Sequence, residues 1–242
     1  GPAWPSRDVP TSQRPHTSTI TTVDNGWDRS ASAWIADMGD RGDFGRQYVL
    51  DPVMLPRALA LKPTTALDVG CGEGELLAWL KHNKSVKARG IELSQQGVHR
   101  AIAKGLSVIQ GDADADLAHY PGGAYDYVIL SQTLQTLRDP KEVLSHLVRI
   151  ARHAIVSVPN FGHWKNRAYL AFKGRMPVTK SLAYQWYDTP NIHFCTIKDF
   201  VIFCEELGIT IEDRVGVDAH GHRTKFSGRG HMANLFCEQG VF

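Results

Sequence analysis

The chain has 242 residues, with 27 basic and 25 acidic side chains and a formal net charge of +2. Hydrophobic residues make up 43% and charged residues 21%, which is the composition of a globular chain and excludes a mostly disordered one. This length accommodates one α/β core of ordinary size. The nearly balanced charge gives no strong field for nucleic acid, and no run of about 18 apolar residues is present to span a bilayer. We therefore expect no nucleic-acid partner and no membrane partner.

The four cysteines lie in apolar segments without the close spacing of a metal-binding pair; they are Cys71, Cys195, Cys204 and Cys237. We expect free thiols in a reducing cytoplasm, which predicts a cytoplasmic protein. The eleven histidines are scattered and lack the spacing of zinc ligands, so no metal site is predicted.

The N-terminal part of the chain differs in composition from the rest. Residues 1–26 are polar and proline-rich, and we expect a disordered tail whose initial Gly-Pro is the scar of a cleaved expression tag. Residues 27–62 mix aromatic, glycine and charged residues and end in a predicted helix over 53–61. They have two interpretations, a lid over a binding site or a helix packed on the edge of a sheet. Residues 63–242 form the predicted main domain.

From residue 65 onward, short β-rich runs alternate with helical stretches. The predicted strands are 66–69, 88–92, 107–110, 125–130, 154–158, 209–217 and 233–238. The predicted helices are 75–82, 95–104 and 141–150, the last starting after an Asp139-Pro140 cap. Such alternation predicts an α/β fold with a mostly parallel, seven-stranded sheet and helices on both faces. The last two runs are separated by a glycine-rich loop, which indicates an antiparallel hairpin.

A glycine-rich turn, in the sequence ALDVGCGEG, follows the first predicted strand. Gly70 and Gly72 place no side chain between the backbone and a ligand, and the next helix directs its free N–H groups to the same place. A polar or anionic group should therefore bind there. The spacing is G-x-G-x-G, and Glu75 stands where the dinucleotide fingerprint has its third glycine. A nicotinamide dehydrogenase is accordingly a distant alternative.

Two acidic residues end the second and third predicted strands. Glu92, in RGIELS, can accept hydrogen bonds from both hydroxyls of a ribose. Asp112, in IQGDAD, can accept one from the exocyclic amine of adenine, while the N–H of Ala113 meets the ring. Glu92 could instead be a solvated strand end and Asp112 a turn residue. The order of the three strand ends favours a shared ligand, because open α/β sheets bind ligands at the carboxyl edge.

As a set, DVGCGEG, IEL, GDAD and DYVILSQTLQTL resemble the motifs of the class I S-adenosylmethionine-dependent methyltransferases. This resemblance implies a Rossmann-like sheet of order 3-2-1-4-5-7-6, S-adenosylmethionine as cofactor and S-adenosylhomocysteine as product. It assigns the amino-acid part of the cofactor to Asp68, Gly70, Cys71 and Gly72. The ribose, adenine and sulfonium sides are assigned to Glu92 with Leu93, Asp112 with Ala113, and Ser131 with Gln132.

The second half of the chain is also similar to the MetW family of methionine-biosynthesis proteins, through GLSVIQGDAD, AIVSVPNFGHWKNR and GRMPVTKSLAYQWYDTPNIHFCTIKDF. That family is associated with homoserine O-acyltransferase, and its motifs do not guarantee methyl transfer. The resemblance therefore implies either an enzyme or a regulatory partner of that acyltransferase. This chain differs from the family in its additional N-terminal residues, which would suit a closed catalytic pocket.

The connection over about 160–195 is the longest irregular stretch and is rich in aromatic residues, so we predict that it binds the methyl acceptor. His163 and His193 could act as a base near neutral pH or could be structural hydrogen-bonding residues. Tyr187 could form an aromatic wall for the acceptor or belong to the core. A buried small-molecule acceptor fits such a loop best. The sequence leaves open which atom of the acceptor is methylated and whether the chain forms a homodimer.

Overall fold

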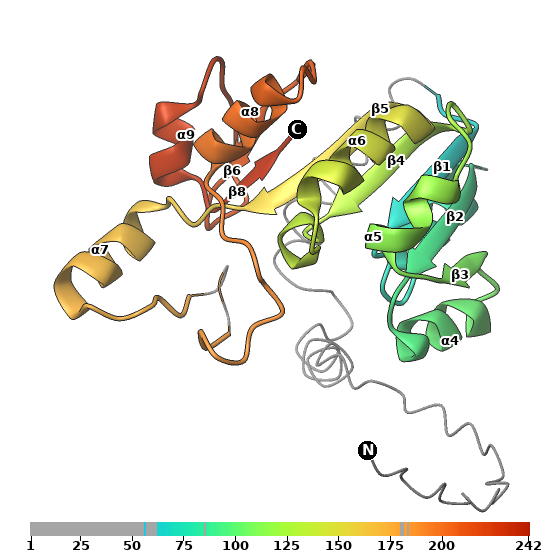
Figure 1. Ribbon diagram of the computed structural model, residues 1–242, viewed down its shortest axis with the longest axis horizontal. Coiled ribbons are helices and arrows are strands. Elements are labelled where there is room, and N and C mark those ends of the chain that lie inside the picture. Colours follow the sequence, from blue (N-terminus) through green and yellow to red (C-terminus); the bar gives the residue numbers. More distant parts are fainter. Residues whose placement is uncertain (1–55, 57–61, 85, 180–181, 183) are drawn as a thin grey trace, which may run out of the picture.

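The computed structural model describes residues 56, 62–84, 86–179, 182 and 184–242. The predicted tail and nearly all of the predicted lid lie outside the described residues. One mixed sheet carries the fold, with the order β3-β2-β1-β4-β5-β8-β6-β7 (Figure 1). Its strands are β1 (Thr65–Val69), β2 (Lys87–Glu92), β3 (Val108–Gln110), β4 (Tyr125–Ser131), β5 (Ala151–Pro159), β6 (Val215–Val217), β7 (Arg223–Lys225) and β8 (Gln239–Val241).

Helices connect the first five strands and cover the sheet. They are α3 (Glu75–Lys84), α4 (Gln95–Ala103), α5 (Ala113–Asp116), α6 (Pro140–Ile150), α7 (Trp164–Lys173), α8 (Ile197–Glu206) and α9 (His231–Phe236), with short 3₁₀ turns η2 (Leu117–His119) and η3 (Leu134–Thr136). Strands β1 to β5 pair in parallel, and β5, β8, β6 and β7 pair antiparallel. The predicted Rossmann-like fold is therefore confirmed, and β8 takes the place of the expected seventh strand.

The C-terminal part corrects three details of the predicted sheet. The predicted strand 209–217 is a strand only over its last three residues, Val215–Val217. The sheet has eight strands among the described residues instead of seven, because β7 adds an edge strand. All three β7 residues are exposed, so the sequence has no alternating apolar pattern that would predict this strand. Residues 233–238 are not a strand: α9 covers most of them, since Ala233 and Cys237 lie four residues apart and pack together against Ile197 of α8.

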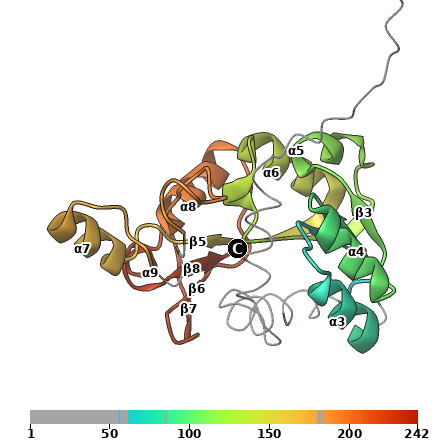
Figure 2. The ribbon, with the colours of Figure 1, turned by 90° about the horizontal axis from the view of Figure 1, so that it is seen from below.

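The core has one layer on each face of the sheet, and Figure 2 shows helices on both sides. On one face, Leu144 and Leu147 of α6 and Phe200 of α8 pack against the central strands. On the other, Leu76 and Leu80 of α3 do so. Alternation along the strands divides the apolar side chains between these two layers, as expected for a sheet that is covered twice.

Side-chain caps begin two of the helices, and the predicted Asp139-Pro140 cap is confirmed. Asp139 caps α6, because its carboxylate accepts a hydrogen bond from the N–H of Glu142 at 3.0 Å, and Pro140 occupies the first turn. Thr196 and Asp199 form a reciprocal capping box at the start of α8. These caps fix where the two helices begin, and hence where the preceding loops reach the carboxyl edge of the sheet.

Candidate functional site

The loop after β1 runs close to two other elements. Gly70, Gly72 and Gly74 have φ values of 71°, 54° and 76°, in the region that favours glycine. A Cβ atom on Gly70 would lie 2.6 Å from Oγ1 of Thr133, in the loop after β4. The backbone of this turn therefore has no room for a side chain on the β4 side.

Glu92, at the end of β2, is bonded directly to that loop. One carboxylate oxygen accepts a hydrogen bond from the N–H of Gly72 at 2.8 Å, and the other accepts one from the N–H of Ser94 at 2.9 Å. Glu92 is only 5% exposed, which contradicts its interpretation as a solvated strand end. A carboxylate has about four acceptor positions, so Glu92 keeps capacity for two further donors. Leu93, beside it, is a partly exposed apolar side chain.

Asp68 and Cys71 are the other predicted residues around the loop. Burial, followed by the nearby charge of Glu92, raises the pKa of Asp68 to about 7. Burial and the neighbouring carboxylates also raise the pKa of the Cys71 thiol, so this group is no nucleophile at neutral pH. Its sulfur lies 2.5 Å from the position that a Cβ of Gly90 would take, and it fills the space between loop and strand.

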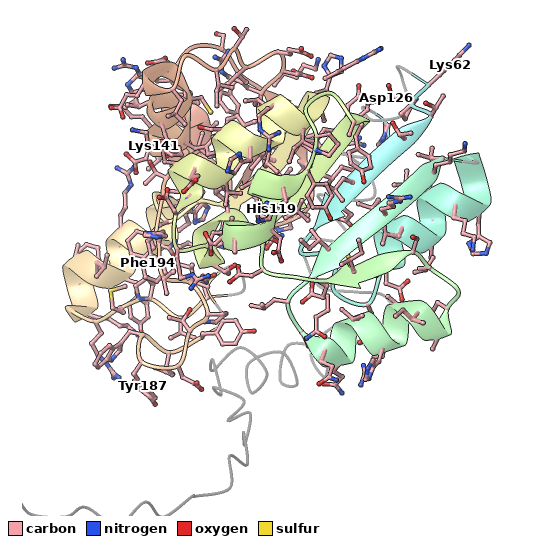
Figure 3. All side chains as sticks on the ribbon, turned by 45° about the vertical axis from the view of Figure 1, so that its right-hand side comes forward. Lys62, His119, Asp126, Lys141, Tyr187 and Phe194 are labelled. Atoms are coloured by element: carbon pink, nitrogen blue, oxygen red, sulfur yellow. The ribbon has the colours of Figure 1, made fainter. Side chains whose placement is uncertain are left out.

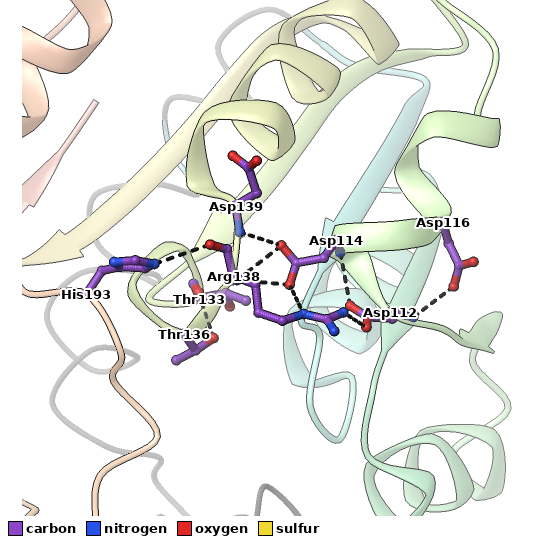
Figure 4. A network of polar contacts seen from close by, with 8 residues as sticks. All are labelled: Asp112, Asp114, Asp116, Thr133, Thr136, Arg138, Asp139 and His193. Carbon is purple, nitrogen blue, oxygen red and sulfur yellow. Dashed lines mark hydrogen bonds and ion pairs between the residues drawn. The ribbon is translucent and has the colours of Figure 1, made fainter. Parts of the chain in front are cut away.

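Asp112, after β3, is the centre of a network of carboxylates (Figure 4). Its side chain accepts a hydrogen bond from the N–H of Asp114 at 3.0 Å, and its own N–H donates to Asp116 at 2.8 Å. It also forms an ion pair with Arg138. Ala113 is the first residue of α5, where an N–H has no acceptor inside the helix. Arg138 was not among the predicted site residues, since no short motif links it to Asp112.

The end of β4 connects to β5 and β8. Gln132 has a φ of 51°, which is uncommon for a residue with a side chain. Its N–H donates to Ser157, and its side-chain amide donates to Gln239 at 3.1 Å. The hydroxyls of Ser131 and Ser157 lie 3.3 Å apart. Ser131 and Gln132 are therefore held rigidly beside the loop after β1.

Gln135 is a second site residue that the sequence motifs did not predict. Its side-chain amide N–H donates to the carbonyl of Gln132 at 2.6 Å, and its own backbone carbonyl accepts from Ile192 and His193, each at 3.0 Å. The side-chain oxygen is buried and has no hydrogen-bond partner among the described residues. Gln135 thus joins the end of β4 to the aromatic loop and leaves one buried acceptor for a further donor.

The three predicted catalytic residues have different surroundings. His163 is buried and caps α7, accepting a hydrogen bond from the N–H of Lys165 at 3.4 Å, and burial lowers its pKa. His193 is exposed, with its Nε2 atom 3.4 Å from the carbonyl of Arg138. Tyr187 lies at the periphery, in edge-to-face contact with Trp186 (Figure 3). The capping contact favours the structural interpretation of His163, and the exposure of Tyr187 contradicts a place in the core.

A pocket lies within the predicted acceptor connection. Its lining is mainly apolar and aromatic: Phe161, Met176, Pro177, Leu182, Tyr184, Trp186, Thr189, Asn191 and Phe194. Asn191 and Phe194 flank the two residues that bond to Gln135. The pocket is therefore linked through Gln135 to Gln132 at the end of β4.

The turn between β6 and β7 brings together three side chains that could bind a metal ion. Asp218, His220 and His222, in the turn between β6 and β7, are the only group found in the described part of the chain whose ligand atoms lie close enough together to hold a metal. Two of the three side chains are exposed.

Within the described part of the chain, no helix combines the length and the apolar character needed to cross a membrane.

The family model of the methionine biosynthesis protein MetW matches residues 57–242. This chain belongs to the MetW family. The bifunctional methionine biosynthesis protein MetXA/MetW of Rhodopirellula baltica is 32% identical over 161 residues, which cover 63% of this chain and 26% of that protein. Ajmaline N-methyltransferase of Rauvolfia serpentina is 33% identical over 98 residues, 37% of this chain and 33% of the enzyme. The MetW-family chain thus aligns with only a quarter to a third of each relative.

Solved structures share the fold of this MetW-family chain. A SAM-dependent methyltransferase of Thermotoga maritima superposes with a TM-score of 0.61 at 16% identity, over 89% of this chain and 95% of that one. A SAM-dependent methyltransferase of Archaeoglobus fulgidus gives 0.57 at 15% identity, over 86% and 97%. The fold is therefore that of the class I methyltransferases, as the sequence motifs predict.

Proposed function

We propose that this MetW-family chain is a methyltransferase that uses S-adenosylmethionine and acts on a small-molecule acceptor. The hydrogen bond from Gly72 to Glu92 carries the proposal, because it joins the loop after β1 to the acid that ends β2. Parallel α/β sheets bind ligands at this edge, where neighbouring strand ends converge. The fold shared with the Thermotoga and Archaeoglobus methyltransferases supports the same assignment.

The residues at the edge fit the parts of this cofactor. The backbone of the turn at Gly70 and Gly72 would hold the amino-acid part. The buried carboxylate of Glu92 would accept hydrogen bonds from the ribose hydroxyls. Asp112 and Ala113 would meet the adenine, while Ser131 and Gln132 would lie on the sulfur side. When bound, the cofactor supplies a methyl group on a positively charged sulfur, already activated for transfer. The protein then mainly has to orient an acceptor and exclude water.

The acceptor would bind between Gln132 and the pocket in the aromatic loop. The aromatic lining suits an apolar or cationic small molecule through ring faces. The unpartnered oxygen of Gln135 would accept a hydrogen bond from an N–H or O–H of the bound molecule, since a buried acceptor without a partner is costly. His193 is the better placed of the two histidines to take a proton, because it is exposed beside Arg138 while His163 is committed to capping α7.

Calorimetry with S-adenosylmethionine, S-adenosylhomocysteine and NAD tests the cofactor class. We expect both adenosyl ligands to bind, and binding of NAD alone would overturn the proposal. Incubation with S-adenosylmethionine and a pool of small metabolites tests the acceptor class. Release of S-adenosylhomocysteine that depends on the pool would support a small-molecule methyltransferase, and release only with added protein or nucleic acid would contradict it.

A second candidate function is a regulatory partner of homoserine O-acyltransferase. The Rhodopirellula relative, which combines MetXA and MetW in one protein, favours this candidate. Exposed aromatic side chains are also available to a partner, since Phe172 of α7 is 89% exposed and Trp186 and Tyr187 of the aromatic loop are largely exposed. A homodimer through these exposed side chains is an alternative arrangement.

Co-purification with a homoserine O-acyltransferase separates these roles. A partner role predicts a complex that is lost when Phe172 and Trp186 are both changed to serine, without loss of S-adenosylhomocysteine binding. A complex together with no turnover on any metabolite would favour the regulator over the enzyme. Sedimentation of the wild type and of the double variant shows whether these side chains form a homodimer contact.

A further inference from the structure

Arg138 lies between the end of η3 and the cap of α6, and its guanidinium points at the acidic cluster after β3 (Figure 4). It forms an ion pair with Asp112, and its Nε atom lies 3.3 Å from a carboxylate oxygen of Asp114. The Arg138 side chain is 69% exposed, and that of Asp112 is 34% exposed. The guanidinium therefore lies on the open side of the Asp112 carboxylate.

Hydrogen bonds from backbone N–H groups, independent of the guanidinium, hold the chain in place at Arg138. The N–H groups of Arg138 and Asp139 both donate to the Asp114 carboxylate, at 3.0 to 3.1 Å. Burial alone would raise the pKa of Asp114, but these two backbone bonds, together with the hydrogen bond and charge of the Arg138 guanidinium, lower it and keep Asp114 charged as an acceptor. Replacing the Arg138 side chain should therefore leave the loop in place.

Asp112, by contrast, has little freedom to turn. Its own N–H is bonded to Asp116, and one carboxylate oxygen is taken by the N–H of Asp114. The remaining oxygen is the one in contact with Arg138. An adenine amine that approaches Asp112 would meet the guanidinium at the same oxygen.

We propose that Arg138 competes with the adenine of the cofactor for the carboxylate of Asp112, and thereby sets the affinity of cofactor binding. The inference rests on the proposed function, since it assumes that Asp112 receives the adenine. An exposed ion pair contributes little free energy, so the guanidinium can leave when the ligand arrives. Salt screens such a pair, so competition by Arg138 weakens as ionic strength rises.

Calorimetry with two adenosyl ligands tests the proposal on the full chain. The ligands are S-adenosylhomocysteine and the uncharged fragment 5′-methylthioadenosine, whose own affinity depends little on salt. The variants are Arg138→Ala, Asp112→Ala and the double variant, with Arg152→Ala as a matched control. Arg152 is exposed near the amino end of β5, at the opposite edge of the sheet. Thermal melting by circular dichroism checks that each variant is folded.

Arg138→Ala should bind both ligands about 2–5-fold more tightly than wild type, the range expected for an exposed ion pair. The double variant should bind no more tightly than Asp112→Ala, because no carboxylate is then left to release. Wild-type affinity for 5′-methylthioadenosine should rise between about 0.05 M and about 0.5 M salt, and that of Arg138→Ala should not. Arg152→Ala should match wild type.

Equal or weaker binding by a folded Arg138→Ala would overturn the proposal, as would tighter binding that persists without Asp112. In either case the proposed function would still be supported if wild type binds S-adenosylhomocysteine and Glu92→Ala does not. Failure of wild type and every variant to bind either ligand would instead contradict the proposed function itself.

Discussion

Asp68 is a buried carboxyl group beside a second one, and its pKa of about 7 makes folding depend on pH. Between the two pKa values the native state keeps a proton that the unfolded state, with a pKa near 3.8, has already released. The free energy of unfolding should therefore fall as pH rises from about 4 to about 7, by on the order of 1.4 kcal/mol for each pH step of about 1.

Asp68→Asn should remove this decline, because an amide carries no charge at any pH. Urea unfolding at about pH 5 and about pH 8 measures the effect, and the variant should gain stability relative to wild type at the higher pH. Asp126→Asn is the control: hydrogen bonds from Thr64 and Thr65 lower the pKa of Asp126 to about 2, so its effect should be equal at both pH values. An Asp68→Asn effect that does not change with pH would contradict the raised pKa.

At Asp112, a substitution should reduce cofactor affinity. Asp112→Ala should weaken binding of S-adenosylhomocysteine by about 1–3 kcal/mol, because the adenine amine loses its acceptor. Calorimetry measures this, with Asp188→Ala, an exposed aspartate of the aromatic loop, as the control. Unchanged affinity in Asp112→Ala would mean that the adenine binds elsewhere.

The turn after β1 constrains Gly70 both by its backbone conformation and by a lack of space for a side chain. A comparison with Gly123 separates these two effects. Gly70 has a positive φ and no space for a Cβ, whereas Gly123 has a φ of 65° and open space around it. Alanine at Gly123 should cost about 1–2 kcal/mol of stability from backbone strain alone. Alanine at Gly70 should cost more, and it should also weaken S-adenosylhomocysteine binding. If the two alanine variants changed the free energy of unfolding and the affinity for S-adenosylhomocysteine equally, the close approach of Gly70 to Thr133 would be contradicted.

Asn160 connects three elements after the end of β5. Its side chain donates to the carbonyls of Asn234 and Cys237 and accepts from the N–H groups of Gly162 and Ile197. Asn160→Ala should therefore destabilise the chain by on the order of 3 kcal/mol, since several buried backbone groups lose their partners. Asn191→Ala, in the loop before α8, should stay within about 0.5 kcal/mol. Urea unfolding that shows similar stabilities for both variants would refute this role.

Elements with local signals could be predicted from the sequence. The Asp139-Pro140 cap and the glycine turn lie within a few residues of the structures they determine. The helix α9 could not be told from a strand, because its six residues are too few for periodicity to decide, and only the folded chain shows its packing against α8. Arg138 and Gln135 were missed for a related reason: their partners lie 26 and 57–58 residues away in sequence, and only the folded chain brings them together.

For the molecule as a whole, topology brings the predicted binding residues to one edge. The order β3-β2-β1-β4 places the ends of these four strands side by side. Neighbouring strand ends therefore carry Asp112, Glu92, Gly70 and Gln132, although these residues are far apart in sequence. The sequence motifs predict this convergence well. They do not identify the methyl acceptor, because the loops that recognise acceptors follow no common spacing.

The most direct test of this account is a crystal structure of the chain with S-adenosylhomocysteine. We predict that the ribose hydroxyls lie within hydrogen-bonding distance of Glu92 and that the amino-acid part lies against the backbone of Gly70 to Gly72. The empty side of the sulfur should face Gln132 and the aromatic loop. A ligand bound elsewhere, or one that leaves the Glu92 carboxylate without contact to the ribose, would contradict it.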